Sequence, residues 1–503
     1  MPSTIWLLDR SRVVDGRGFC KRARFNNYHL GPHGYGITMK ATKLPLMTGI
    51  AGHDGLAPIL EWCRDHDDLV QQGLATGIQG DEVYLPVPRE VVRAAVAEAQ
   101  QKYWKAVETR GFAYLREDEG VQAVTREQCY LIEGLIWAWC LEVLPEVLRR
   151  GHIVEVEHDD TYVFGCTCGL GDGVGSQHDH EERDCQGLGL MCKPDFVLET
   201  RLTKELEYHE FKTTSMDSVT FRDKWEVAVQ TFSATLDVER RWGKHVQSVY
   251  IHGLVKGKRE GDYNPDTGKR DGTIRQNSPF VYGYRKPGNP PMEREEWAAL
   301  YEYYDPIEGK NRKLGKAYRK TGVWELPDAY IPEGMTKGEF WATWIPSEAR
   351  KKALVLLGPF SRQTQMVQHF LAECVGEEAG VQAGLWELYD GGQQILADAY
   401  PAGLTDADTA AVWWELVWPD PRWQALLDKL FPRSYECRRY GMRHRCQFEE
   451  ICFEKEGWQD PLGTGKFILR RPHHKAEEEQ AIARGCLLPE EAAAEDADEE
   501  PGW

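Results

Sequence analysis

Two short apolar segments that carry charged residues most constrain how this chain can fold. One spans Pro194–Leu198 and contains Asp195, and the other spans Leu206–Thr213 and contains Glu210 and Lys212. Residues two apart in a strand share a face, so Glu210 and Lys212 are expected on one side of the second segment. If the segments pair as a hairpin, the two carboxylates converge. Two carboxylates and a lysine suit a divalent cation beside a phosphate, whereas the alternative is an ordinary salt-bridged surface hairpin.

Two further polar residues accompany this hairpin, one on each side of it in the sequence. His53 follows a run of small residues that includes Gly49 and Gly52, and we expect it in the first turn of an apolar helix. The alternative for His53 is a capping or solvent-facing histidine. Gln230 lies on a helix predicted from Trp225 to Trp242.

Hydrophobic periodicity predicts the other elements. Three helices, three strands and one long, mostly helical, Trp-rich region are expected. The helices span Phe19–Tyr28, Arg89–Arg110 and Arg126–Leu148; the strands span His152–Cys166, Val246–Gly257 and Pro279–Arg285; the helical region spans Glu293–Leu430.

The hydrophobic share of 42% is that of a globular protein. The length of 503 residues permits two or more domains. No apolar run approaches the roughly 18–20 residues that a membrane span requires, and the N-terminus does not resemble a signal peptide. We therefore expect a cytoplasmic protein with no membrane contact. Its thirteen cysteines should then be reduced or metal-bound.

The net charge of −19 is unevenly distributed. The segment from Ala476 to Trp503 contains ten acids and one arginine, which is typical of a disordered or weakly helical tail. Basic clusters occur elsewhere, for example between Arg433 and Arg445. Most such clusters are solvated faces, so the charge permits nucleic-acid binding without indicating it.

Two groups of cysteines are candidates for metal binding. The glycine-rich segment 165–192 contains six residues that could hold zinc, although their C-x-C and H-x-H spacing is unusual and the alternative is a long loop. They are Cys166, Cys168, His178, His180, Cys185 and Cys192. The second group, Cys437, Cys446 and Cys452, lies in a basic, aromatic segment and lacks a fourth ligand, which Cys20 can supply. Buried free thiols or a zinc knuckle are the alternatives.

The order of these motifs resembles a known family. His53, Asp195, Glu210-x-Lys212 and Gln230 occur in the order found in the RecB-like branch of the PD-(D/E)XK nuclease superfamily. Several members of that branch carry a four-cysteine iron–sulfur cluster, with one cysteine before the nuclease core and three after it. The chain is also similar to phage proteins of this kind. This similarity implies that the protein is located in the cytoplasm of a bacterial or phage-infected host cell.

The resemblance implies an α/β fold, with a mixed central sheet flanked by helices, and a role for each residue. Mg²⁺ or Mn²⁺ would be held by His53, Asp195, Glu210 and the Phe211 carbonyl, with Glu157 as an outer contact. Lys212 would orient water or stabilise the transition state, and Gln230 would orient the lysine or a phosphate. The implied ligands of a structural [4Fe–4S] cluster, or of Zn²⁺ instead, are Cys20, Cys437, Cys446 and Cys452. The implied contacts to the DNA backbone are Arg438, Arg439, Arg443 and Arg445.

The function expected is therefore a metal-dependent deoxyribonuclease, an exonuclease acting on DNA ends or single strands, with recombination or replication proteins as partners. A catalytically silent DNA-binding or assembly protein of the same fold and a zinc-stapled nuclease are the alternatives.

The sequence divides into six regions along the chain. They are an N-terminal segment (1–60), a helical region (61–150), a nuclease core (151–290), a second helical region (291–430), a three-cysteine segment (431–472) and an acidic tail (473–503).

Overall fold

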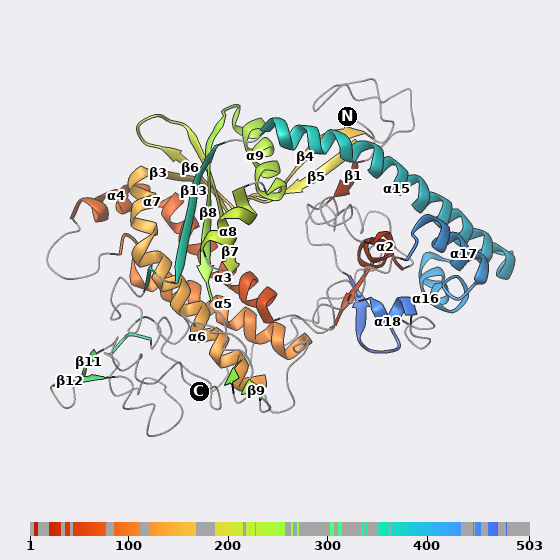
Figure 1. The fold of residues 1–503 in the computed structure, drawn as a ribbon, viewed down its shortest axis with the longest axis horizontal. Coiled ribbons are helices and arrows are strands. Elements are labelled where there is room, and N and C mark those ends of the chain that lie inside the picture. Colours follow the sequence, from red (N-terminus) through yellow and green to blue (C-terminus); the bar gives the residue numbers. More distant parts are fainter. Residues whose placement is uncertain are drawn as a thin grey trace.

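A mixed five-stranded sheet forms the centre of the computed structural model (Figure 1). The residues that the structure describes are 5–8, 20–31, 36–40, 44–76, 85–110, 121–166, 187–214, 218–226, 228–256, 263–264, 269–270, 302–305, 310–313, 333–336, 339, 350–351, 353–361, 364–433, 446, 448–453, 461–470 and 479. In spatial order the central strands are β13 (Leu354–Ser361), β8 (Val246–Val255), β7 (Leu206–Thr214), β6 (Phe196–Thr200) and β3 (Gly151–Val156).

The strand directions follow from the connections. β3, β6 and β7 are antiparallel neighbours, whereas β8 is parallel to β7 and antiparallel to β13. A parallel pair needs a crossover, which α8 (Ser218–Glu226) and α9 (Val229–Trp242) provide. The single helix predicted over Trp225–Trp242 is thus two helices. α9 ends at Gly243, whose φ of +60° is the left-handed conformation that terminates many helices.

Helices α3 to α7 cover one face of the sheet (Figure 1). They are α3 (Leu44–Asp65), α4 (Asp67–Thr76), α5 (Arg89–Arg110), α6 (Val121–Glu142) and α7 (Leu144–Arg150). The predicted stripe on α6 is buried: Ile136 and Trp139 pack with Phe196 and Phe211 in what we call the α6 core. The helix predicted to end at Leu148 is broken near Pro145, because proline is tolerated only in a helix's first turn.

The opposite face forms a second core, here called the α9 core. Phe232 and Leu236 of α9 pack there with Tyr208 of β7 and with a small second sheet. That sheet has the order β1 (Ile5–Leu8), β5 (Gly187–Cys192) and β4 (Asp160–Cys166). The prediction of one strand over His152–Cys166 was wrong, since the polar residues after Val156 form a turn that separates β3 from β4.

A module built from N-terminal and C-terminal segments, which we call the cysteine module, lies to the right in Figure 1. Its elements are α2 (Lys21–Tyr28), β2 (Ile37–Met39), α15 (Thr364–Ala399), α16 (Asp406–Leu416), α17 (Pro421–Leu430), α18 (Glu449–Phe453) and β14 (Phe467–Leu469). An aromatic core that includes Phe25, Trp418 and Phe431 joins the N-terminal and C-terminal segments, and β2 pairs with β14. The helix predicted near Phe19–Tyr28 is confirmed.

The region from Glu293 to Leu430 is only partly helical. β13 lies inside it and extends the central sheet, because Leu357 and Phe360 are buried against β8. Two short pairs complete the described strands: β9 (Tyr263–Asn264) with β10 (Lys269–Arg270), and β11 (Glu302–Asp305) with β12 (Lys310–Lys313). The strand predicted over Pro279–Arg285 lies outside the described residues. Among the described helices, none combines the length and the apolarity needed to cross a membrane.

Candidate metal centre

The predicted hairpin is formed by β6 and β7. Phe196 lies opposite His209 in an antiparallel register, so Asp195, the residue before β6, comes beside Glu210. Along β7 the side chains alternate as expected: Phe211 packs into the α6 core, while Glu210 and Lys212 lie on the face of the α9 core. The hairpin therefore presents two carboxylates and a lysine at one end of the sheet.

Three side chains from separate elements converge at this end. His53 of α3, Glu157 after β3 and Asp195 before β6 place one potential ligand atom each within 4.8 Å of one another. Among the described residues they form the one group of at least three histidine, cysteine or acidic side chains at this spacing. His53 Nδ1 lies 3.0 Å from Asp195 Oδ1, and the second oxygen of Asp195 accepts the backbone N–H of Phe211. One imidazole and two carboxylates are ligands that Mn²⁺ and Mg²⁺ accept.

Glu157 is more central than the sequence indicated. Its φ is +44°, in the left-handed region that residues other than glycine rarely adopt. The backbone N–H of Glu157 donates to the Asp195 carbonyl at 3.1 Å, and its carboxylate accepts from Lys193 Nζ at 2.7 Å. Strained backbone held by neighbouring contacts often marks a functional position. The sequence signal was an acid at the end of a strand, followed by a polar turn.

Glu210 and Lys212 form a pair beside the three-residue group. Lys212 Nζ donates to Glu210 Oε1, and the buried Tyr208 hydroxyl donates to Glu210 Oε2. Lys212 Nζ also lies 5.3 Å from the ring centroid of Trp225. Tyr208 was not selected from the sequence, although its position two residues before Glu210 placed it on the same face of β7.

The electrostatics of the centre favour an ionised Asp195. Burial alone would raise the pKa of Asp195, but the nearby His53 and Lys212 and the Phe211 N–H overcome this and lower it to about 2. Burial likewise opposes protonation of His53, and the Asp195 carboxylate outweighs it and raises the pKa of the imidazole. The carboxylate is therefore present in its metal-binding form at neutral pH.

His53 lies in the middle of α3, so its placement in the first turn of a helix was wrong. The run of small residues before it is itself helical. A Cβ on Gly49 would lie 3.2 Å from Thr213 Oγ1, so the missing side chain allows α3 to approach β7 closely. This approach carries the imidazole to Asp195.

A buried ring network supports the strands under the centre. Trp139 Nε1 donates to His252 Nδ1 at 3.2 Å, and His252 Nε2 lies 2.8 Å from His209 Nδ1. Because the indole can only donate, His252 carries its proton on Nε2 and donates to His209. Burial lowers the pKa of both histidines well below the usual value, so both are neutral. The network joins α6, β8 and β7 directly below Phe211.

Gln230 is the second residue of α9, and its side chain lies outside the described part of the chain.

Phe211, whose carbonyl was a predicted ligand, contacts two members of the metal group. Its backbone N–H donates to Asp195, and its ring packs edge-on to His53 at 6.0 Å between centroids.

The structure brings the segments of Cys20, Cys446 and Cys452 together around one core, although these three described side chains do not form a group at metal-ligand spacing. Cys20 precedes α2, and Asn26 of α2 donates to Cys452 Sγ of α18 at 3.9 Å. Cys446 is half-buried and packs against the same aromatic core. Cys437 lies outside the described residues. The four predicted DNA contacts lie there as well: Arg438, Arg439, Arg443 and Arg445.

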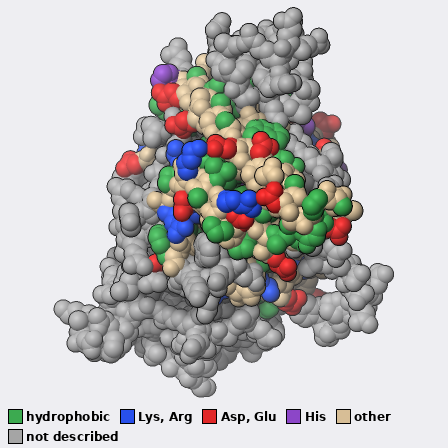
Figure 2. All heavy atoms as spheres, turned by 90° about the vertical axis from the view of Figure 1, so that its right-hand side faces the viewer, with side chains coloured by type: hydrophobic (Ala, Val, Ile, Leu, Met, Phe, Trp, Pro, Cys, Tyr) green, Lys and Arg blue, Asp and Glu red, His purple; other side chains and the backbone are tan. Residues whose placement is uncertain are grey.

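The described residues on the face shown in Figure 2 form no continuous basic stripe. Figure 2 shows Lys and Arg side chains interspersed with Asp, Glu and hydrophobic side chains on the face that includes α15 to α17. Several of the basic groups are paired: Arg422 with Asp398 at 2.9 Å, and Lys429 with Glu387 at 3.0 Å.

The predicted second metal site is not assembled by its described members. Cys166 pairs in register with Gly187, whereas Cys192 pairs with Asp160 at the other end of the β4–β5 hairpin. Five residues of extended strand, at about 3.4 Å each, separate them, so one zinc ion cannot bind both. The other members lie outside the described residues: Cys168, His178, His180 and Cys185.

Comparison with protein-family models gives no match for this chain, and none of the curated proteins matches its sequence.

Proposed function

We propose that the chain is a metal-dependent nuclease of the PD-(D/E)XK type that hydrolyses phosphodiester bonds in DNA. The observation that carries the proposal is the convergence of His53, Glu157 and Asp195 beside the Glu210–Lys212 pair. An ordinary salt-bridged hairpin would not require an acid with left-handed backbone or a histidine delivered by a third element.

The sheet topology supports the same proposal. An antiparallel run of three strands, β3, β6 and β7, is followed by a helical crossover to the parallel strand β8. The acids lie at the β6–β7 end of this unit, and the mixed sheet flanked by helices is what the resemblance to the RecB-like branch implies. The proposed ligand set differs from the sequence-based set, because Glu157 joins His53 and Asp195 while both oxygens of Glu210 bind Lys212 and Tyr208.

The residues have separate roles in the proposed reaction. A divalent cation held by His53, Glu157 and Asp195 would polarise a phosphate oxygen and acidify a bound water. Lys212 has three N–H donors, of which Glu210 takes one, so the others can orient the attacking water or the charged phosphate. Water adds to phosphorus, the bond to the leaving sugar oxygen breaks, and that oxygen takes up a proton.

The cysteine module fits a structural role. We propose that Cys20, Cys437, Cys446 and Cys452 hold a [4Fe–4S] cluster, or alternatively Zn²⁺. Thiolate ligands carry negative charge, and basic side chains lie beside Cys452: Arg433 donates to its carbonyl at 2.8 Å, and Arg22 is close by. A group bound there would fasten segments more than four hundred residues apart, closing a very long loop.

One purification tests both parts. The full chain is isolated without oxygen, its iron, sulfide and zinc contents are measured, and end-labelled single- and double-stranded DNA is added with Mg²⁺ or Mn²⁺. We expect cleavage that chelation abolishes and that Asp195→Asn reduces to background. Asp390→Asn, an exposed acid on α15, is the matched control.

Full cleavage by Asp195→Asn, or no cleavage by the unmodified chain with either metal, would reject the nuclease. Protein that contains neither iron nor zinc would reject the cluster and leave the nuclease proposal unaffected.

A further inference from the structure

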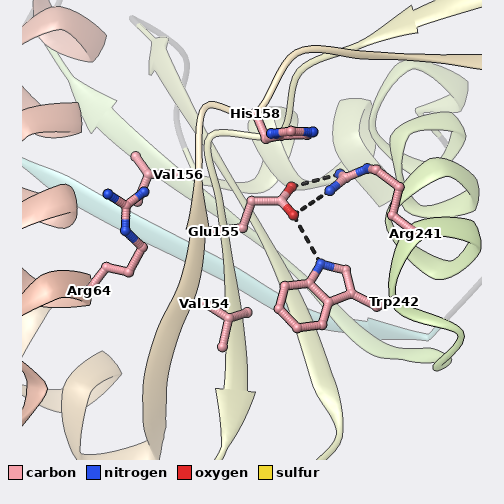
Figure 3. Close-up of a pocket in the computed structure, with 7 residues that line it drawn as sticks. All are labelled: Arg64, Val154, Glu155, Val156, His158, Arg241 and Trp242. Atoms are coloured by element: carbon pink, nitrogen blue, oxygen red, sulfur yellow. Dashed lines mark hydrogen bonds and ion pairs between the residues drawn. The ribbon is translucent and has the colours of Figure 1, made fainter.

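A cavity separate from the metal group wraps around the open edge of β3 (Figure 3). Its volume is about 390 Å³, within the range of roughly 300–1,000 Å³ typical of small-ligand sites. Arg64 of α3 lies on one side of the strand and Trp242 of α9 on the other, with Glu155 between them. Among the described strands β3 pairs only with β6, so this edge has no neighbouring strand.

A β-bulge shapes the floor of this edge cavity. The register between β3 and β6 shifts between Ile153 and Glu155, so Val154 and Glu155 both turn toward α9. Glu155 Oε1 accepts from Arg241 at 2.7 Å, and Oε2 accepts from Trp242 Nε1 at 2.9 Å. Both carboxylate oxygens of Glu155 are thereby engaged by donors from α9.

The same contacts hold an aromatic surface in place. The hydrogen bond to Glu155 fixes the indole of Trp242, yet this residue remains 37% exposed. A fixed, exposed aromatic face is what an unpaired nucleobase stacks on, and such a contact tolerates any base. A paired base is covered by its neighbours in the duplex, so the surface favours single strands.

Nitrogen donors lie at the other positions of the cavity. The guanidinium of Arg64 contacts Asp65 through Nε and Nη2 at 2.8 and 3.3 Å, and its Nη1 has no partner among the described residues. The exposed imidazole of His158 lies at the end of the cavity near Arg241 (Figure 3). These donors suit a phosphate oxygen.

The edge cavity and the metal centre are neighbours along the chain. Val156 and His158, which line it, are the two neighbours of Glu157. Arg64 shares α3 with His53, eleven residues or about 16 Å along the helix. At this separation, a strand with one phosphodiester at the metal group can place a nearby nucleotide beside the cavity.

We infer that the edge cavity binds a nucleotide of a single-stranded nucleic acid next to the phosphodiester that is cleaved. The base stacks on Trp242, and a phosphate faces Arg64 and His158. This inference rests on the proposed nuclease and narrows its substrate to unpaired strands. An extended peptide added to the β3 edge is the competing occupant, and the experiment separates the two.

The test compares Trp242→Leu with Trp386→Leu, an exposed tryptophan on α15, in the full chain with Mn²⁺. On single-stranded DNA we expect Trp242→Leu to raise KM about tenfold and leave kcat within about twofold. Trp242→Phe keeps a stacking ring and should restore most of the affinity. An abasic residue placed beside the cleaved bond should raise the KM of the unmodified chain and leave the KM of Trp242→Leu little changed.

The phosphate contact has its own signature. Arg64→Gln should lower the slope of log K against log salt by about 0.7, the value for one phosphate of a single strand, and Arg422→Gln should not. A wild-type KM in Trp242→Leu together with a wild-type salt slope in Arg64→Gln would overturn the inference. A site that binds a peptide instead predicts this same result.

A failure of the nuclease itself gives a different result. If the unmodified chain cleaves nothing, the proposed function is rejected, and fluorescence anisotropy of the same labelled strand then decides the cavity. Weaker binding by Trp242→Leu than by Trp386→Leu supports the cavity, and equal binding overturns it.

Discussion

The metal centre and the cysteine module join distant parts of the chain by different means. At the centre, polar side chains meet on a sheet: Asp195 and Glu210 come from adjacent strands, and only His53 arrives from far away in the sequence. In the module, an aromatic core and buried ion pairs join α2 to helices more than 350 residues later.

The two regions differ in the property that a substitution should change first. A polar cluster at a strand end contributes little burial of apolar surface, so changes there should affect reaction more than stability. The module buries large aromatic side chains and a fully buried ion pair, so changes there should affect stability first. Four substitutions test this separation, from the largest expected effect to the smallest.

The largest effect is expected at the ion pair between Arg24 and Glu378. Arg24 Nη2 lies 2.6 Å from Glu378 Oε2, and the two side chains are 5% and 2% exposed. Arg24→Met leaves a buried carboxylate without its partner, which should lower the free energy of unfolding by about 3–5 kcal/mol. Denaturant unfolding measures the loss, and kcat at low temperature should change little.

The double variant Arg24→Met/Glu378→Gln is the control for this pair, and it should recover most of the stability. A variant that keeps its stability but loses activity would reverse the assignment of roles to the two regions.

Lys212→Met should have the opposite signature at the metal centre. It removes a donor positioned by Glu210, so kcat should fall by about 10²–10³-fold. Glu210 is buried and loses its cation, but Tyr208 still donates to it, so the loss of stability should be smaller than for Arg24→Met, and kcat is compared at a temperature where the variant is folded. Lys105→Met, an exposed lysine on α5, is the matched control. An unchanged kcat in Lys212→Met would show that the β7 pair is only structural.

Tyr208→Phe tests a residue that acts through another. Its hydroxyl donates to Glu210 Oε2, so removal should free the carboxylate and lower activity by about 10–100-fold, as for other supporting contacts around metal sites. The signature is a fall in kcat with little change in KM. Tyr389→Phe, exposed on α15, controls for the loss of a hydroxyl. Equal kinetics in the two variants would reject the positioning role.

The sequence predicted the hairpin and its polar face because strand alternation is local: it depends on Glu210, Phe211 and Lys212 being consecutive. The helix of His53 was misplaced because glycines read as a turn in sequence, whereas here Gly49 permits close packing against Thr213. That contact is tertiary and leaves no local pattern. The same holds for Glu157, whose conformation depends on Asp195 and Lys193.

The edge cavity and the ring network were also beyond the sequence. Arg64, Glu155 and Trp242 lie on three elements, and no spacing relates them. β13 was missed because it is inserted between helical segments and joins the sheet only by pairing with β8. Such non-local pairings become visible only once the fold is known.

The smallest expected effect is a pH dependence that belongs to the sheet region alone. Burial lowers the pKa of Lys256, beyond β8, to about 8 from its ordinary value near 10.5. Between these values the unfolded chain binds a proton that the folded chain has released, so stability from this group rises as pH increases from about 8 to about 10.5. Below pH 8 the buried ammonium carries its full cost. Lys256→Met should therefore be more stable than the unmodified chain at pH 7, by roughly 1–3 kcal/mol for a partly solvated group, and the difference should vanish above about pH 10.5. Denaturant midpoints across this range measure the difference in stability.

Lys429→Met in the cysteine module is the control. Because that lysine is exposed, the difference in stability should not vary with pH. A flat difference for Lys256→Met as well would show that its ammonium is solvated, and the sheet region would then tolerate charge as easily as the surface of the module.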